Sequence, residues 1–299
     1  MKLIADYQNG NTNVKLYSNG TREMRTEDDE FNLDFPVSMD LSITKNCDGN
    51  CPYCYLGCST SGEHGDILSP KFLETIQPGT EIAINLNSCN HPQLLPFLQT
   101  MRKRNIIVNG SINQVHFMRY HAMLKRLCDN KLLWGLGISL HKPTVEFVRL
   151  VKEFDNAVIH VINGIFDADD IEMLRDNNIK LLILGYKPIG RGADYISENN
   201  VVIGMRQQYL HDVLPTMIDK FALVSFDNLA IEQLDVRRIL TDDQWETFYQ
   251  GDEGSCSMYV DLVNSTFGVS SLCADSDMYP LMDDISDMFA VVKQKARTA

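Results

Sequence analysis

Three closely spaced cysteines constrain this chain of 299 residues more than any other feature. Cys47, Cys51 and Cys54 form a C-x3-C-x2-C run, with the aromatic residue Tyr53 directly before the last cysteine. Thiolates are preferred ligands of iron–sulfur clusters and of zinc. A structural zinc site closes with a fourth ligand, usually from a second Cys or His pair, and no such pair follows in the sequence. The run therefore favours a 4Fe–4S cluster with three protein-bound irons and one iron open to a small molecule.

The sequence around this run alternates between short apolar strands and amphipathic helices. A strand is expected over residues 35–43, directly before the cysteines. Strands that alternate with helices of about 10–15 residues indicate a parallel sheet with right-handed crossovers. Six such units predict an α/β fold, a partial (βα)6 TIM-like barrel. The later strands are expected at 81–86, 106–112, 133–140, 157–162 and 180–184, and the helices at 91–104, 117–130, 143–154 and 169–177.

Both ends of the chain are expected to form separate small modules. Turn signals at Asn9-Gly10 and Asn19-Gly20 divide the first residues into short strands. This β meander would extend an edge of the main sheet or serve as a lid. We expect the meander over residues 1–34, the barrel over 35–240 and a β-hairpin and helix extension over 241–299, with its helix at 283–295.

The composition argues against several classes of protein. The net charge is −13, from 40 acidic and 27 basic residues, whereas nucleic-acid binding depends on Lys and Arg. No apolar run approaches the roughly 18 residues of a membrane span, and residues 1–7 lack the pattern of a signal peptide. Eight cysteines, three of them at ligand spacing, indicate metal binding in a reducing cytoplasm rather than disulfides.

The cysteine run, the strand before it and the βα units after it resemble the signature of the radical S-adenosylmethionine (SAM) enzymes. The resemblance implies a 4Fe–4S cluster on Cys47, Cys51 and Cys54, with the amine and carboxylate of SAM on the open iron. It also implies reductive cleavage of SAM to a 5′-deoxyadenosyl radical that abstracts hydrogen from a substrate. An electron donor such as a flavodoxin or ferredoxin would serve as partner. Residues 63–67 and Asn87 further resemble a phage-type subgroup of this family.

Polar residues at the carboxyl ends of the predicted strands are candidate SAM ligands, because parallel sheets bind ligands at that edge. In the family a Gly-Gly-Glu-Pro run after the second strand binds the SAM amine, and here Asn87 stands where the acidic residue would be. An amide oxygen accepts from an ammonium without charge assistance. The resemblance places Tyr53 against adenine. Lys187 and Arg191, after the sixth strand, could bind a carboxylate. The other candidates end the third, fourth and fifth strands: Asn113, Ser139 and Asn163.

The segment from Cys256 through Gly268 to Cys273 resembles the Twitch or SPASM extension of this family, which holds auxiliary iron–sulfur clusters. A full auxiliary site needs about four thiolates, and no cysteine follows Cys273. We expect a degenerate extension without a cluster, which could form a wall of the substrate site. An auxiliary cluster is the alternative. Cys58 is expected to be a buried thiol rather than a ligand.

Two kinds of function fit these observations. The first is radical chemistry on an unactivated C–H bond, with a peptide or protein as substrate if the SPASM-like tail is the guide, or a nucleotide or small molecule otherwise. The second is a non-catalytic iron–sulfur binding or sensor protein, which the missing Gly-Gly-Glu run keeps open. The sequence does not rank the possible hydrogen donors, which are Tyr186, Tyr259, Cys89 and Cys273.

Overall fold

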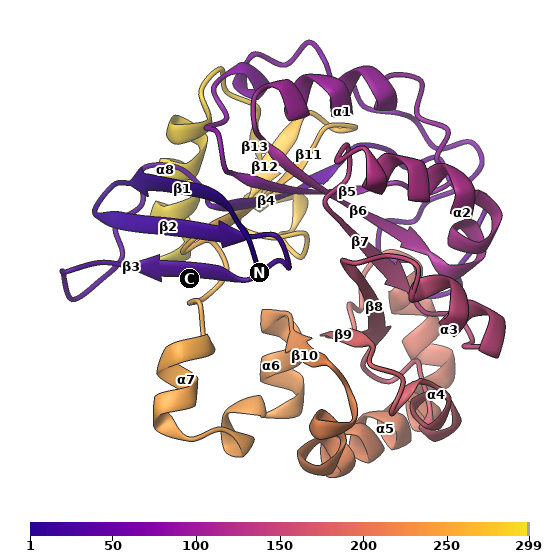
Figure 1. Cartoon of the computed structure of the whole chain (residues 1–299). Coiled ribbons are helices and arrows are strands. Elements are labelled where there is room, and N and C mark those ends of the chain that lie inside the picture. The colour runs from indigo at the N-terminus through magenta and orange to yellow at the C-terminus, as the bar shows by residue number, and fades with distance from the viewer. Residues whose placement is uncertain (298–299) are drawn as a thin grey trace.

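The computed structural model describes residues 1–297 and contains one large, mostly parallel sheet (Figure 1). Residues 298 and 299, the end of the predicted extension, lie outside the described residues. The sheet strands are β4 (Ser38–Ser42), β5 (Glu81–Asn85), β6 (Ile107–Asn113), β7 (Gly135–Ser139), β8 (Ala157–Ile162), β9 (Lys180–Leu184), β10 (Leu223–Phe226), β11 (Ser257–Asp261), β12 (Thr266–Gly268) and β13 (Tyr279–Pro280).

The order of these strands makes an open sheet. It reads β10-β9-β8-β7-β6-β5-β4-β11-β12-β13, with β10 and β13 at the two edges. Strands β4 to β10 run parallel to one another and β11 is parallel to β4, whereas β12 and β13 are antiparallel. All six predicted strands are present. The structure adds β10 as a further parallel strand, which is too short, at four residues, to produce a recognisable alternation.

Helices connect the parallel strands from β5 to β10, whereas the connection from β4 to β5 contains only a 3-10 turn. Figure 1 shows the first five helices arranged around the outside of the curved sheet. They are α1 (Leu94–Lys103), α2 (Gln114–Asp129), α3 (Val145–Val151), α4 (Ala168–Leu174), α5 (Arg191–Met217), α6 (Asn228–Leu234), α7 (Asp242–Phe248) and α8 (Ile285–Ala296). Short 3-10 turns occupy Lys71–Glu74, Ile218–Lys220, Val236–Ile239 and Asp275–Asp277. Of the helices in residues 1–297, none combines the length and apolar character that a membrane crossing requires.

Polar caps fix where several of these helices begin. The Asn113 side chain accepts from the backbone N–H of His116 at the start of α2, and Thr144 accepts from Phe147 at the start of α3. Asp167 starts α4 with a reciprocal capping box. Each cap satisfies a backbone donor that has no partner within its helix. The caps therefore set the connections just past the carboxyl ends of β6, β7 and β8.

The two faces of the sheet differ in burial. Along each strand from β4 to β9, alternate apolar side chains are fully buried, as expected for the face that packs against helices. The intervening positions carry half-buried or exposed polar side chains on several strands, and we call them the polar face. Its members include Asp40, Asn85, Asn109, Ser111, Ser139 and His160. The polar face ends at the carboxyl edge, where the candidate residues lie.

The predicted N-terminal meander is present as β1 (Leu3–Asn9), β2 (Thr12–Tyr17) and β3 (Arg22–Arg25), all antiparallel. It forms its own three-stranded sheet, so the expectation that it extends an edge of the main sheet is wrong. Arg22 donates two hydrogen bonds, of 3.0 and 2.6 Å, to Glu81, the first residue of β5. Asn156, directly before β8, donates to the carbonyl oxygen of Ser18. The meander is therefore fastened to the amino-terminal edge of the main sheet.

The C-terminal hairpin joins the main sheet directly. Strand β11 pairs with β4 along its whole length, from Ser257 opposite Ser38 to Asp261 opposite Ser42. Strand β12 then returns antiparallel to β11, and α8 follows β13. The strand that leads into the cysteines thus has β5 on one side and β11 on the other. The domain boundaries at 34/35 and 240/241 stay a prediction.

Candidate functional site

The cysteine loop, residues 47–58, leaves the carboxyl end of β4 and is closed at its base by backbone pairing. The Cys47 N–H donates to the Ser59 carbonyl over 2.8 Å, and the Ser59 N–H donates to Lys45 over 3.0 Å. The Lys45 N–H in turn donates to Glu63 over 2.8 Å. The residues before and after the loop therefore form a short ladder that presents the three cysteines at the carboxyl edge of the sheet.

The three thiols are half-buried, and Cys47 and Cys54 lie close enough to Cys51 to act on it electrostatically. Burial, followed by the neighbouring Cys54 and Cys47 thiolates, raises the pKa of Cys51. A hydrogen bond from the buried Cys58 thiol lowers the pKa of Cys54 to about 6 and raises that of Cys58. Three soft donors on one loop fit an iron–sulfur cluster, in which each thiolate binds a different iron. Within residues 1–297, no three Cys, His, Asp or Glu side chains converge as they would around a single metal ion.

Two glycines allow the close packing of this loop. A Cβ atom on Gly49 would lie 2.5 Å from Nδ2 of Asn113 and 3.3 Å from Sγ of Cys47. Gly190 has a φ of +55°, and a Cβ there would lie 2.3 Å from the carbonyl oxygen of Tyr55. A side chain at either position would collide with neighbouring atoms, and the second position also requires a left-handed backbone. The loop is thus in direct contact with the ends of β6 and α5.

Arg191, the first residue of α5, is bound to the cysteine loop. Its Nε donates to the carbonyl oxygen of Cys51 over 3.0 Å, and another guanidinium nitrogen donates to that of Cys58 over 2.7 Å. Its backbone N–H donates to the carbonyl oxygen of Cys54 over 3.1 Å. Arg191 therefore lies at the candidate site, with its guanidinium held by loop carbonyls. Binding of a carboxylate by Arg191 stays a prediction.

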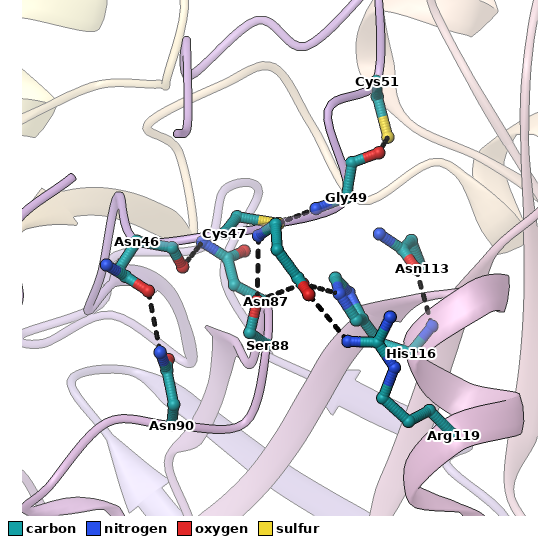
Figure 2. Close-up of polar contacts among 11 residues, drawn as sticks. Asn46, Cys47, Gly49, Cys51, Asn87, Ser88, Asn90, Asn113, His116 and Arg119 are labelled. Carbon is teal, nitrogen blue, oxygen red and sulfur yellow. Dashed lines mark hydrogen bonds and ion pairs between the residues drawn. The ribbon is translucent and has the colours of Figure 1, made fainter. Parts of the chain in front are cut away.

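Asn87 also lies against the loop (Figure 2). Its Nδ2 donates to the carbonyl oxygens of Thr44, at 3.1 Å, and Asn46, at 3.2 Å, and lies 3.5 Å from Sγ of Cys58. The backbone of Asn87 has a φ of +46°, a region in which Asn is one of the few tolerated side chains. The left-handed backbone is thus a second physical reason for an amide at this position. The role of Asn87 toward the SAM amine stays a prediction.

Lys187 stands among charged and aromatic groups beyond β9. Its ammonium lies 2.8 Å from Oγ of Ser271 and 4.5 Å from the centroid of the Tyr55 ring. The Asp40 residue is exposed, but the protein around its carboxyl group displaces water and so raises its pKa. The attraction of Lys187 opposes this effect. Burial likewise raises the pKa of Glu253, again against the attraction of Lys187. Lys187 is therefore a basic side chain close to two acidic ones, Asp40 and Glu253.

The remaining candidates are distributed along the carboxyl edge. Asn113 and Ser139 are opposite each other on β6 and β7, and Asn113 contacts the loop at Gly49. Tyr53 packs edge-on against Tyr195 with ring centroids 5.7 Å apart. Asn163 is fully buried and donates to Gln233 of α6 at 3.1 Å, while its Oδ1 has no hydrogen-bond partner in residues 1–297. Tyr53 lies within the cysteine loop, and Asn87, Asn113 and Arg191 contact it. The assignment of all the candidates as SAM ligands stays a prediction.

Sequence reasoning missed one residue of the loop, Asp48, and the three residues that bind it. Asp48, inside the cysteine run, binds the side chains of Ser88, His116 and Arg119. Hydrogen bonds from Arg119, then Ser88 and His116, hold the pKa of Asp48 well below its usual range. The signal in the sequence was an acidic residue beside a candidate ligand cysteine. Its partners lie far along the chain and carry no spacing that would mark them.

The fold defined by these elements is an α/β fold with a large parallel sheet and a cysteine loop after the first strand of that sheet. A solved structure with a similar fold is that of SuiB from Streptococcus suis, which was determined bound to S-adenosylmethionine. The TM-score is 0.56, and the match covers 89% of this chain and 67% of SuiB. The two chains are 13% identical, so the likeness concerns the fold. No protein-family profile matches the sequence, and no curated protein is significantly similar to it.

Proposed function

We propose that this chain is a radical SAM enzyme whose cysteine loop holds a 4Fe–4S cluster with SAM at the open iron. The observation that carries the proposal is the position of three half-buried thiols at the carboxyl edge of a sheet whose fold is similar to that of SAM-bound SuiB. When bound, the cluster supplies the electron that cleaves SAM and yields a 5′-deoxyadenosyl radical able to abstract hydrogen. A flavodoxin or ferredoxin is the proposed source of that electron.

The residues of the chain itself would bind the cluster and would bind and orient SAM. Cys47, Cys51 and Cys54 provide the three thiolates. Nδ2 of Asn87 is occupied by the carbonyl oxygens of Thr44 and Asn46, and its Oδ1 accepts from Nδ2 of Asn85 over 3.4 Å. The second lone pair of Oδ1 would accept a hydrogen bond from the SAM amine. Lys187 carries a positive charge near the same edge and is the proposed partner of a carboxylate. The remaining proposed SAM contacts are Tyr53, Asn113, Ser139, Asn163 and Arg191.

The proposed substrate is a peptide or protein, with a nucleotide or small molecule as the alternative. Support for a peptide comes from the C-terminal hairpin, whose sequence resembles the SPASM extension and whose first strand lies directly beside β4. In that position the extension could border the substrate site. The acidic groups near Lys187 are compatible with a substrate that carries positive charge.

A second candidate is a protein that binds the cluster without turnover. The observation that favours it is the use of the Asn87 amide nitrogen by backbone carbonyls, which leaves one uncharged oxygen for the SAM amine. An uncharged acceptor binds an ammonium less strongly than a carboxylate does. This candidate retains the cluster and loses SAM cleavage.

One experiment separates the two. Protein reconstituted with iron and sulfide without oxygen is reduced in the presence of SAM, and 5′-deoxyadenosine is measured by chromatography and mass spectrometry. We expect this product from the wild type and none from a variant with Cys47, Cys51 and Cys54 all replaced by Ala, which should also lose the brown chromophore. A wild type that holds about four irons and forms no 5′-deoxyadenosine would favour the non-catalytic candidate. A triple variant that keeps its iron and sulfide would refute the cluster assignment.

A further inference from the structure

The carboxylate of Asp48 has three side-chain partners although it lies in a short, partly exposed loop. Its Oδ1 accepts from Oγ of Ser88 over 2.8 Å and from Nε2 of His116, and its Oδ2 accepts from Arg119 over 2.7 Å. The Asp48 backbone N–H also donates to Oγ of Ser88 over 3.0 Å. Figure 2 shows His116 and Arg119 reaching from one helix toward the loop between Cys47 and Gly49.

Two of these partners have different surroundings. His116 is fully buried, and its Nδ1 has no hydrogen-bond partner in residues 1–297. The bond to Asp48 is therefore the one hydrogen bond of a buried imidazole, and its loss would leave both ring nitrogens unpaired, which is costly. Arg119 is about half exposed. The carboxylate thus joins a buried anchor on one side to a solvent-facing cation on the other.

The network connects three segments that are separate in sequence. Asp48 belongs to the cysteine loop, and Ser88 follows Asn87 just beyond the carboxyl end of β5. His116 and Arg119 lie in the first two turns of α2, which begins directly after β6. One side chain therefore fixes the cysteine loop to the carboxyl ends of two neighbouring strands.

The packing under the loop leaves little freedom for another position. A Cβ atom on Gly49 would lie 3.2 Å from Cε1 of His116 and 3.3 Å from Sγ of Cys47. The imidazole and the thiol of the first cysteine thus both pack around the position that a side chain at residue 49 would take. Hydrogen bonds to charged groups are about twice as strong as neutral ones, so the contacts of the Asp48 carboxylate favour this position of the loop.

We propose that Asp48 is the positioning residue of the cysteine loop: through Ser88, His116 and Arg119 it holds Cys47 against the ends of β5 and β6. The inference rests on the proposed function in so far as the loop receives a cluster. Every contact in the network is made by the chain alone, so the network supports the loop independently of a cluster. Positioned thiolates avoid the loss of conformational freedom that a mobile loop would suffer on binding.

The test compares Asp48→Ala with Asp66→Ala. Asp66 is a matched control because it also lies between β4 and β5 and its carboxylate accepts two backbone hydrogen bonds, from Leu68 and Ser69, without touching the cysteine loop. Hydrogen exchange of the metal-free proteins is measured by mass spectrometry over residues 45–60. We expect exchange to be about 10-fold faster in Asp48→Ala and unchanged in Asp66→Ala. Equal exchange in both variants would overturn the proposal.

Reconstitution provides a second readout. Asp48→Ala should bind several-fold less iron and sulfide than Asp66→Ala, or show a shifted electron paramagnetic resonance spectrum and midpoint potential. Asp48→Asn keeps an oxygen for Ser88 and should restore part of the loading. Circular dichroism and urea unfolding verify that each variant is folded. If even the wild type bound no cluster, the proposed function would fail, while the exchange result would still decide the role of Asp48.

Discussion

Nε of Arg191 donates a hydrogen bond to the carbonyl oxygen of Cys51 over 3.0 Å, which joins the first residue of α5 to the middle cysteine of the run. A second guanidinium nitrogen reaches Cys58. The planar guanidinium can serve both carbonyls at once, and an ammonium cannot reproduce this geometry. The side chain thus supports the backbone of the loop that carries the thiols.

We therefore expect Arg191→Lys to lower cluster loading in reconstituted protein, and Arg191→Ala to lower it further, because buried carbonyls lose their donors at roughly 1–3 kcal/mol each. Iron and sulfide analysis measures the effect. The control is Arg206→Ala on the same helix, since Arg206 donates to the carbonyl oxygen of Ile165 far from the loop. Equal iron contents in all three variants would contradict this role.

The proposed SAM site can be tested at Asn87 with a substitution that does not strain the backbone. Its φ of +46° suits glycine, so Asn87→Gly removes the side chain without forcing a new conformation. We expect SAM to bind about 10- to 100-fold more weakly, the effect of losing one hydrogen bond to a charged group, with the affinity expressed per bound cluster because the variant also loses the hydrogen bonds from Nδ2 to Thr44 and Asn46. Titration of SAM into the reduced cluster, followed by electron paramagnetic resonance, measures the affinity. Asn90→Ala, which removes a bond to the Asn46 side chain, is the control. Unchanged affinity in Asn87→Gly would exclude Asn87 from the site.

Iron stoichiometry tests whether the C-terminal extension holds a cluster. The Cys256 thiol lies 3.6 Å from the carbonyl oxygen of Gln250, and burial raises its pKa. We expect about four irons per chain, one cubane, rather than about eight, and the same number in a Cys256→Ala, Cys273→Ala double variant. A loss of several irons in that variant would reveal an auxiliary cluster.

His160 should make stability depend on pH. The ring lies across Gly137 of the neighbouring strand, and burial lowers the pKa of His160 from 6.5 to about 4. Between these values the unfolded chain binds more protons than the folded chain, so stability falls as the pH falls. From pH 7 to pH 5 the wild type should lose about 2 kcal/mol of unfolding free energy through this group. His160→Phe removes that contribution. Urea unfolding of both proteins at the two pH values measures the difference, and parallel losses would show that the group does not titrate in this way.

The Arg22–Glu81 ion pair should contribute most of the free energy that holds the N-terminal meander against the main sheet. Both side chains are only 14% exposed and approach to 2.6 Å. Arg22→Met leaves Glu81 without its partner and should cost about 3 kcal/mol of unfolding free energy, whereas Arg22→Met with Glu81→Leu should recover much of this loss. In the exposed Lys71–Asp283 pair, solvent screens the charges, so Lys71→Ala should leave the free energy of unfolding nearly unchanged. Equal effects of Arg22→Met and Lys71→Ala would disprove the assignment.

The parts of this structure that the sequence predicted are those with local signals. The strand before Cys47 and the helices after the second to fifth predicted strands follow from periodicity, whereas α5, after the sixth strand, was not predicted. Strand β8 even has the predicted bounds. The meander was predicted from its turns, but its place at the amino-terminal edge depends on the Arg22–Glu81 contact, which has no local signal.

The site was predicted as a set of positions rather than as contacts. Strand ends are polar whenever loops begin there, so the sequence alone does not separate Asn113, which touches the cysteine loop, from Asn163, which is buried against Gln233. The partners of Asp48 are Ser88, His116 and Arg119, which come from two segments that are distant in the sequence. They become neighbours of Asp48 only when β4, β5 and β6 pair in register. Such contacts follow from tertiary structure, which periodicity does not encode.

The parallel pairing of β11 with β4 has a consequence for the order of events in the cell. The two strands come from opposite parts of the chain, and a ribosome releases β4 long before it releases residues 257–261. Until then one edge of β4, the strand that leads into the cysteine loop, has no partner and is open to wrong pairing. The strand before the cysteine loop therefore gains its second neighbour, β11, only late in synthesis. Until then the nascent chain would expose its thiols next to a strand that is paired on one side only.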